Sequence, residues 1–337
     1  MRRCKGLLLT IALGQVAVAL SQPFQLPTPN EAIFESGKEA DYFTPTIGRT
    51  WPSGTFGCVR SEGWQMHEGL DIKCTQRDAK GEPIDPVSAA ADGTIAYINA
   101  KPGLSNYGKY IVMRHKIDKL SVYTLYAHLR IIERGLNVGQ AKKSGEIIAT
   151  MGRTTNTQQG ISRERAHMHF EICLLANPNF SVWYKNNLPG QRNDHDRWNG
   201  QNLIGIDPWK VFLSQQRAKA KRQAFSLQKF IRNQPVLCRV LIRSPGLQWV
   251  RRHPGLVDPL TTLNDIAGYE VSLDPNGVPV RCVPRETSVF IDSEPFKLLY
   301  VDPEVYKLAP CRKLVFNKAQ QWVLTARGTS HLKLLAF

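Results

Sequence analysis

Short runs in which apolar and polar residues alternate, separated by turns that carry glycine, fill the chain between residues 51 and 180. Examples are GTIAYI at 93–98, YIVMRH at 110–115 and SVYTLYAH at 121–128. Successive side chains of a strand point to opposite faces of a sheet, and β-branched and aromatic residues favour strands. The sequence therefore predicts a mainly β fold, with a compact antiparallel β-sheet domain over residues 51–180.

The first 21 residues have the composition of a secretory signal peptide. Arg2, Arg3 and Lys5 precede a mostly apolar run that ends at Leu20, next to small residues suited to cleavage. An uncleaved anchor is the alternative. No later stretch is long and apolar enough to cross a bilayer as a helix, so we expect no stable membrane insertion after cleavage. The expected location is the periplasm or the extracellular space.

The remaining segments differ in composition. Residues 22–50 are rich in proline and read as a linker or a draped N-terminal arm. Residues 181–206 are polar and predict a long surface loop. Asp207 followed by Pro208 is a typical helix start, so 181–234 is expected to be a loop and a basic helical connector. Residues 235–337 return to a β-like pattern and predict a small β-rich C-terminal domain of unknown role.

Six cysteines remain once residues 1–21 are set aside: Cys58, Cys74, Cys173, Cys238, Cys282 and Cys311. An even number in an exported protein indicates disulfide bonds. We expect local pairs, Cys58 with Cys74 and Cys282 with Cys311, although spacing alone leaves the connectivity open. No CxxC spacing is present, so a structural zinc site made of cysteines is not expected.

Charge is distributed unevenly along a chain whose formal net charge is +16. Between residues 208 and 257 there are eleven Lys and Arg and no Asp or Glu. Such a block favours a polyanionic partner, which for an exported protein means peptidoglycan or another anionic cell-envelope polymer. A merely solubilising surface is the alternative. Nucleic acid is not expected, because the sequence has no nucleic-acid-binding motif.

Histidines are concentrated in three short motifs: HEGLD at 67–71, YAHL at 126–129 and HMHFE at 167–171. The third motif reads as a strand, so His167 and His169 share one face while Met168 and Phe170 occupy the other. The apolar pair would enter a core. The histidine pair would line a cleft and supply one metal ligand and one proton-transfer group.

The first motif offers a nitrogen and an oxygen ligand, His67 and Asp71. Gly69 disfavours a helix between them, so a turn leading into a strand is expected. Imidazole and carboxylate are both normal zinc ligands, and a catalytic zinc ion has three protein ligands and one open position.

The three motifs, in this order, resemble those of the lysostaphin-type zinc peptidases, which cut peptidoglycan cross-links. Framing segments agree with the resemblance: FG at 56–57 with Arg60, PVSAAADG at 86–93, GKYIVMRH at 108–115, GQ at 139–140, SGEIIA at 144–149 and MG at 151–152. The resemblance covers roughly residues 50–175. One departure is the stretch 154–166, which is longer and more charged than the usual turn and is expected to reshape one wall of the groove.

This resemblance implies one zinc ion held by His67, Asp71 and His169, with His128 and His167 as catalytic histidines that do not bind the metal. It also implies a groove across the sheet. The expected function is an exported metalloendopeptidase that hydrolyses peptidoglycan stem peptides or cross-links. Two alternatives remain: an inactive peptidoglycan-binding or hydrolase-activating module, and a zinc peptidase that acts on proteins.

Overall fold

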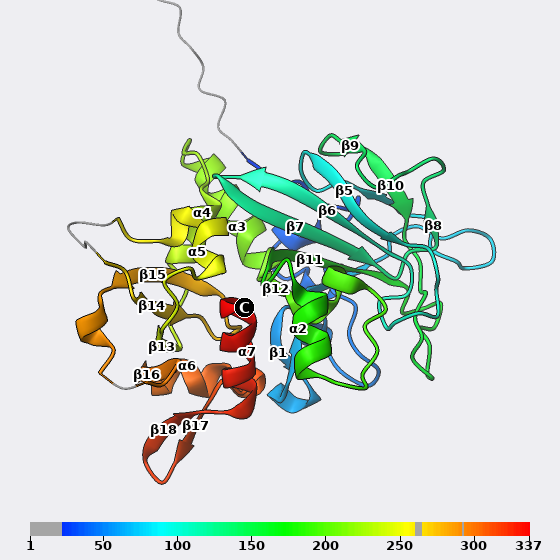
Figure 1. Cartoon of the computed structure of the whole chain (residues 1–337). Helices are drawn as coiled ribbons and strands as arrows, with labels where there is room; N and C mark the ends of the chain where they lie inside the picture. The colour runs from blue at the N-terminus through cyan, green and yellow to red at the C-terminus, as the bar shows by residue number, and fades with distance from the viewer. Residues whose placement is uncertain (1–21, 260–264, 292) are drawn as a thin grey trace, which may run out of the picture.

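Two antiparallel β units, joined by helices, make up the fold in a computed structural model that describes residues 22–259, 265–291 and 293–337 (Figure 1). The signal peptide expected over residues 1–21 lies outside the described residues. The mainly β architecture expected from the alternation is confirmed. Among the described residues, no helix combines the length and the apolar character needed to span a bilayer.

The larger unit is built on an antiparallel sheet whose strand order is β12-β11-β7-β6-β5-β9, with β3 also paired to β11. The strands run as follows: β3 Leu70–Lys73, β5 Gly93–Asn99, β6 Tyr110–Ile117, β7 Leu120–Ala127, β9 Ala141–Lys142, β11 His167–Leu175 and β12 Leu203–Ile206. The three segments expected to be strands from their alternation are β5, β6 and β7, so these predictions are confirmed.

Strand β11 pairs with three other strands of this sheet, and all nine of its residues are buried. Its first half pairs with β3 and its second half with β12, while β7 lies along its other side. In this register His169 is opposite Asp71 on one side and Ala127 on the other. The three histidine motifs are therefore brought to one place by strand pairing.

Smaller elements surround this sheet. A hairpin is formed by β1 Gly57–Arg60 and β2 Gln65–His67, and a three-stranded sheet by β4 Pro86–Ser88, β10 Ile147–Thr150 and β8 Ile131–Ile132. Short helical turns are η1 Ala32–Phe34, α1 Glu39–Tyr42, η2 Trp51–Gly54 and η3 Ser61–Gly63.

Residues 22–50 form an arm that packs on the larger unit. The Gln215 side chain bonds the backbone N–H and C=O of Phe24, each at 2.9 Å. Tyr42 and Phe43 are fully buried, and the Phe43 ring contacts Trp51 and Trp209. The segment is thus in contact with the helix α3 and with the core of the larger unit.

The surface loop expected over residues 181–206 is wrong. This segment contains α2 Phe180–Asn187, η4 Asp196–Trp198, η5 Gly200–Asn202 and then β12, which pairs with β11. The four residues of β12 are all buried. A strand of only four residues between polar segments gives no clear alternation in the sequence, and its pairing with β11 is what identifies it as a strand. The sheet of the larger unit therefore extends beyond residue 180.

The basic helical connector forms in two pieces, as expected: α3 Pro208–Ala220 and α4 Leu227–Arg232. The Asp207 side chain accepts from the backbone N–H groups of Trp209 and Lys210, so it caps α3 as its position before Pro208 predicted.

The C-terminal unit is β-rich, as expected. Its antiparallel sheet has the order β15-β14-β13-β16 and carries a separate hairpin, β17-β18. The strands are β13 Cys238–Ile242, β14 Gly268–Leu273, β15 Pro279–Arg285, β16 Phe296–Val301, β17 Val315–Lys318 and β18 Gln321–Leu324. The helices are α5 Gln248–Arg252, η6 Pro254–Leu256, η7 Thr287–Val289, α6 Pro303–Leu308, η8 Pro310–Arg312 and α7 Ala326–Ala336.

A disulfide joins Cys58 of β1 to Cys311 of η8, so both expected local pairs are wrong. Cys74, Cys173, Cys238 and Cys282 are free and buried. The expected pair of Cys58 with Cys74 is not formed because the two cysteines lie on segments with different partners: Cys58 is in β1, which pairs with β2, whereas Cys74 follows β3, which pairs with β11. The bond ties the hairpin that carries His67 to the C-terminal unit.

Removal of this disulfide is expected to lower the free energy of unfolding by about 2–5 kcal/mol, because the bond closes a very long loop of the unfolded chain. The variant C58S/C311S should melt at a lower temperature than the unsubstituted chain in a thermal scan. Reductant should lower the melting temperature of the unsubstituted chain and leave the variant unchanged. Equal melting temperatures with and without reductant would contradict this.

Candidate metal centre

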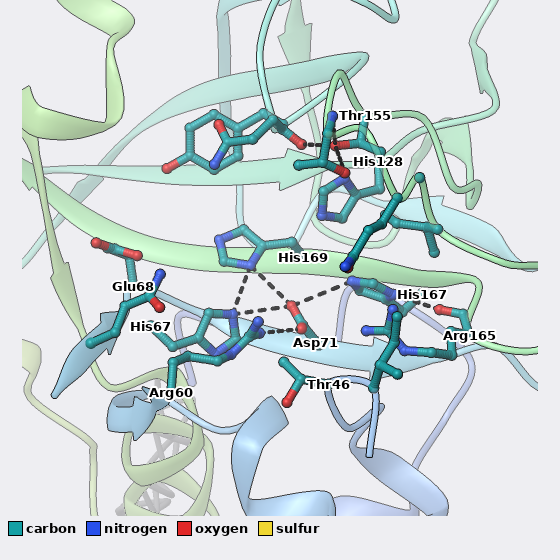
Figure 2. A pocket seen from close by; sticks show the side chains of 18 of the residues that line it. Thr46, Arg60, His67, Glu68, Asp71, His128, Thr155, Arg165, His167 and His169 are labelled. Atoms are coloured by element: carbon teal, nitrogen blue, oxygen red, sulfur yellow. Dashed lines mark hydrogen bonds and ion pairs between the residues drawn. The ribbon is translucent and has the colours of Figure 1, made fainter. Parts of the chain in front are cut away.

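Three potential ligands converge from three strands: His67 ends β2, Asp71 lies in β3 and His169 lies in β11 (Figure 2). His67 Nε2, Asp71 Oδ1 and His169 Nδ1 form a triangle in which each pair is 3.1 Å apart. All three residues are at most 5% exposed. The structure thus brings together the three residues that the family resemblance implied as metal ligands.

Gly69 explains why the turn between His67 and Asp71 can lie directly on β11. A Cβ atom at this position would be 2.3 Å from the carbonyl oxygen of Phe170, a distance that no side chain tolerates. The glycine therefore allows the turn to approach the backbone of β11 closely enough for its two flanking ligands to reach His169.

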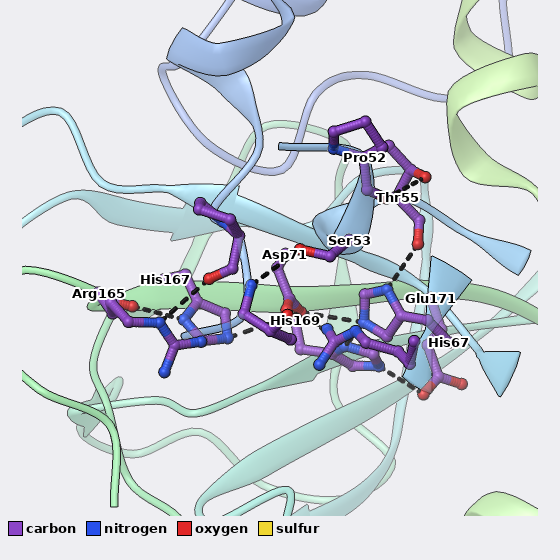
Figure 3. A network of polar contacts seen from close by, with 12 residues as sticks. Pro52, Ser53, Thr55, His67, Asp71, Arg165, His167, His169 and Glu171 are labelled. Carbon is purple, nitrogen blue, oxygen red and sulfur yellow. Dashed lines mark hydrogen bonds and ion pairs between the residues drawn. The ribbon is translucent and has the colours of Figure 1, made fainter. Parts of the chain in front are cut away.

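Hydrogen bonds behind the two ligand histidines determine which ring nitrogen carries the proton (Figure 3). His67 Nδ1 lies 2.7 Å from the carbonyl oxygen of Thr55, which can only accept, so Nδ1 is the protonated nitrogen. His169 Nε2 donates in the same way to Glu171 Oε1 at 2.8 Å. The lone pairs of His67 Nε2 and His169 Nδ1 therefore face each other and Asp71.

This donor set fits a zinc ion. Two nitrogen lone pairs and a carboxylate oxygen at 3.1 Å spacing repel one another unless a cation lies between them. A tetrahedral zinc ion with ligands at about 2.0–2.2 Å separates those ligands by about 3.3–3.5 Å, close to the spacing seen here. His67, Asp71 and His169 could hold the metal after a small outward adjustment.

The electrostatics of the cluster also favour a cation. Without a metal ion, and although burial opposes its charged form, hydrogen bonds to the carboxylates of Asp71 and Glu171 raise the pKa of His169 to about 9. The Nδ1 of His169 then holds a proton that it donates to Asp71, and a bound metal ion would take the place of that proton. Burial likewise opposes ionisation of Asp71, but His67, His167 and His169 hold the pKa of its carboxyl well below its usual range. A positive charge at the centre of the cluster is thus stabilised by this chain's own residues.

Arg60 contacts the second oxygen of Asp71, with Nη2 2.5 Å from Oδ2. This ion pair leaves Oδ1 for the cluster and fixes the rotation of the carboxylate. The sequence reasoning used Arg60 only as a framing residue and assigned it no role. Its position becomes evident only from the pairing of β1 with β2, the strand that ends in His67.

Glu171 orients His169 from behind. Its Oε1 also accepts from the Tyr107 hydroxyl at 2.7 Å, and its Oε2 is 3.1 Å from Cys173 Sγ. Burial and the Glu171 carboxylate raise the pKa of both the Tyr107 hydroxyl and the Cys173 thiol, so both stay protonated and donate to Glu171. Glu171 therefore lies on the same face of β11 as His169.

His128 and His167 lie beside the cluster, with ring centroids 4.9 Å apart. The Nδ1–H of His167 donates to the Arg165 carbonyl at 2.6 Å, and that of His128 to the Thr154 carbonyl at 2.9 Å. Their Nε2 atoms are therefore the unprotonated ones, and His167 Nε2 is 3.6 Å from Asp71 Oδ1. Burial lowers the pKa of His167, and burial with the neighbouring histidines lowers that of His128 to about 3.

An open pocket of about 430 Å³ is lined by all five residues expected from the sequence to form the site: His67, Asp71, His128, His167 and His169. One wall comes from the long stretch 154–166, which contributes Thr155, Thr157, Gln159, Gly160, Ile161 and Arg165. The stretch 154–166 therefore forms part of the groove, and its effect on the shape of the groove stays a prediction. The arm contributes Thr46 and Ile47 to the opposite wall.

Comparison with known proteins gives matches to the larger unit. Residues 65–179 match the model of peptidase family M23. Lipoprotein NlpD of Yersinia enterocolitica is 35% identical over 95 residues, which are 28% of this chain and 84% of that protein. Murein hydrolase activator NlpD of Escherichia coli is 36% identical over 134 residues, which are 38% of this chain and 29% of that protein.

Coverage of the longer relatives is partial. This chain spans 29–39% of the length of the first curated relatives that it matches. Among solved structures, the catalytic domain of lysostaphin from Staphylococcus simulans is 20% identical, with a TM-score of 0.28, over 51% of this chain and 89% of that domain.

If His67, Asp71 and His169 bind zinc, replacement of one of them should abolish stoichiometric zinc binding, whereas replacement of a neighbouring residue should not. We expect Asp71→Asn and His169→Ala to lose bound zinc, and Glu171→Gln to bind zinc about 10- to 100-fold more weakly, because it no longer orients His169 through a charged acceptor. His167→Ala is the matched control and should keep one zinc per chain. Metal content after dialysis and competition with a chromophoric chelator measure both quantities, and full zinc retention in Asp71→Asn would exclude this ligand set.

Proposed function

Because the chain belongs to peptidase family M23, we propose that it is a zinc-dependent metalloendopeptidase that hydrolyses peptide bonds in peptidoglycan stem peptides or cross-links. The observation that carries this proposal is the arrangement of four histidines in one pocket, each with one nitrogen hydrogen-bonded outward and the other turned inward. Two of these histidines complete a metal site and two remain for proton transfer.

The metal would be held by His67 Nε2, Asp71 Oδ1 and His169 Nδ1. When bound there, zinc supplies Lewis-acid polarisation of the scissile carbonyl and activation of a water molecule. Arg60 and Glu171 keep these ligands in position through the contacts described above. Burial of the three ligands excludes bulk water from their side of the pocket.

His167 is the best candidate for the general base. Its Nε2 is free to accept a proton, and the nearby Asp71 carboxylate stabilises the imidazolium that results. His128 presents its own Nε2 to the same pocket and could receive a proton and return it to the leaving amine. Its backbone has φ of 61°, a left-handed conformation at the end of β7 that aims the ring at His167.

A second candidate function is activation of another wall hydrolase. It is favoured by the name of the Escherichia coli relative, a murein hydrolase activator. The presence of all five chemically competent side chains in one pocket favours the enzyme. A zinc peptidase that acts on proteins is the third reading, and it requires the same pocket with a different substrate.

The basic connector supports an anionic envelope partner. Arg232 and Arg239 of the block pair with Asp258 and Glu270. Five other members are exposed and have no ion-pair partner within the described ranges 22–259, 265–291 and 293–337: Arg217, Lys219, Lys221, Arg222 and Lys229. This group, here called the connector patch, lies at the end of α3 and on α4 and suits a polyanion such as peptidoglycan with its attached polymers.

The location proposed for the protein is consistent with an anionic envelope polymer as its partner. Similar proteins are named lipoproteins, and the Cys58–Cys311 disulfide belongs to an oxidising compartment. The protein acts outside the cytoplasm, in the periplasm or the extracellular space.

Purified peptidoglycan should be cleaved by the zinc-loaded chain. Clearing of a gel with embedded peptidoglycan should disappear with a chelator and return with zinc, and mass spectrometry of the released fragments identifies the bond. His167→Ala should slow cleavage by about 10²- to 10⁴-fold, the usual contribution of a general base, while retaining zinc.

The other readings give different results in the same assay. A zinc-loaded chain that clears nothing alone but accelerates an added wall amidase would support the activator. Casein cleavage without wall cleavage would support the protease.

Neutralisation of the connector patch should weaken binding to peptidoglycan. The variant R217Q/K219Q/K221Q/R222Q is expected to co-sediment with peptidoglycan sacculi about tenfold more weakly at low salt, with the difference shrinking at high salt as charges are screened. The control K80Q/K101Q/K185Q/K318Q removes the same charge from exposed sites elsewhere and should bind as the unsubstituted chain does. Equal losses in both variants would show that only net charge matters.

A further inference from the structure

We propose that Arg165 is a specificity-determining residue that binds a free carboxylate of the substrate next to the scissile bond. The inference rests on the proposed function and names the substrate class: peptides that carry a negatively charged carboxylate, as opposed to its amide, at a residue adjoining the bond that is cut.

Arg165 is placed where a substrate group next to the reacting bond would lie. It belongs to the turn that leads into β11, lines the pocket, and precedes His167 by two residues (Figure 2). Its backbone carbonyl accepts the Nδ1–H of His167 at 2.6 Å. The residue that orients the proposed base thus also presents a cation beside it.

The Arg165 side chain is held at its inner nitrogen and free at its outer ones. Its Nε donates to the carbonyl of Pro45, in the arm, at 3.0 Å (Figure 3). Its two terminal nitrogens have no hydrogen-bond or ion-pair partner within residues 22–259, 265–291 and 293–337. A guanidinium fixed at Nε presents its terminal nitrogens in one direction, which suits a two-point contact with a carboxylate.

Other arginines around this pocket and its long loop are committed to partners. Arg60 pairs with Asp71, Arg130 with Asp78, and both Arg153 and Arg163 with Glu82. Arg77 donates to three backbone carbonyls. Because these other arginines all have partners, the unpaired terminal nitrogens of Arg165 are not a general feature of a loop rich in charge.

No nearby carboxylate is available to form an ion pair with the Arg165 guanidinium within the part of the chain that the structure describes. Asp71 acts on Arg165 electrostatically, but its Oδ2 is bonded to Arg60 and its Oδ1 contacts the histidine cluster. The Arg165 side chain is partly buried, which strengthens an ion pair with an incoming carboxylate relative to one formed in bulk water.

The substrate class follows from this chemistry. Peptidoglycan peptides carry α- and side-chain carboxylates that are either free or amidated, and the two forms are nearly identical in shape. A guanidinium distinguishes them by charge, because the amide cannot accept two charge-assisted hydrogen bonds. A pair of this kind changes binding by about 10- to 100-fold.

Two synthetic cross-linked peptides that differ only in one carboxylate, free or amidated, at the residue next to the scissile bond test the inference. Binding is measured by calorimetry on the zinc-loaded full chain carrying His167→Ala, and turnover on the chain without that substitution. We expect the acid to bind about 10- to 100-fold more tightly than the amide and to have the lower KM, with kcat little changed.

Arg165→Gln should abolish the preference, because it weakens binding of the acid peptide and leaves binding of the amide peptide unchanged. Arg165→Lys should restore part of the preference. Arg163→Gln is the matched control, since it removes a neighbouring exposed arginine that pairs with Glu82, and the preference should persist. Zinc content and melting temperature confirm that each variant is folded.

The carboxylate site and the peptidase activity are tested separately. Equal binding of acid and amide, or an Arg165→Gln variant that weakens both equally, would overturn the role of Arg165 even if both peptides are cleaved. Absence of cleavage of either peptide, with the acid still preferred in the binding measurement, would overturn the peptidase and leave the carboxylate site intact.

Discussion

A neutral imidazole can offer a lone pair from one nitrogen only when the other nitrogen holds the proton, and the whole pocket depends on how that proton is fixed. Thr55, Thr154, Arg165 and Glu171 each provide an oxygen that receives an outward N–H. With these four acceptors in place, every lone pair faces inward. Without them, the rings could rotate or exchange tautomers, and neither a metal site nor a proton acceptor would be defined.

Three of the four acceptors are backbone carbonyls outside the strands of the main sheet. Thr55 follows η2, Thr154 lies in the long loop and Arg165 in the turn before β11. Their positions are set by a local turn at Thr55 and by a tertiary contact at Arg165. The Thr55 N–H and hydroxyl both bond the Pro52 carbonyl, and the Arg165 side chain bonds Pro45 of the arm. The arm and the long loop thus hold the proton positions of the histidines as well as forming walls.

The C-terminal unit is linked to the same pocket from the other side. The disulfide at Cys58 attaches it to the β1-β2 hairpin, and the Asn276 side chain donates to Gly205 of β12 at 2.6 Å. Arg312, next to the disulfide, approaches the pocket residue Glu68 to 3.9 Å. These contacts reach two strands of the larger unit. Strand β2 carries His67, and β12 pairs with β11, the strand that carries His169. The C-terminal unit therefore contributes to the rigidity of the wall that carries His67.

The sequence by itself determined the features that depend on local periodicity. The alternation in 166–172 placed His167, His169 and Glu171 on one face, because the side-chain period of a strand is fixed by backbone geometry. Gly69 predicted a turn, and Asp207 before Pro208 predicted the start of α3. The family resemblance, carried by three ordered motifs, added the groups that meet in the pocket.

Only the tertiary structure decided which distant segments complete the site. The Cys58–Cys311 bond spans 253 residues, and β12 is a strand only because β11 is beside it. The ion pair of Arg60 with Asp71 and the carbonyls behind His128 and His167 likewise leave no periodic signal. Such contacts depend on how loops and chain segments are placed in space, and backbone carbonyls are common to every residue. Sequence could therefore name the reactive side chains, whereas the fold alone fixed where their protons and lone pairs point.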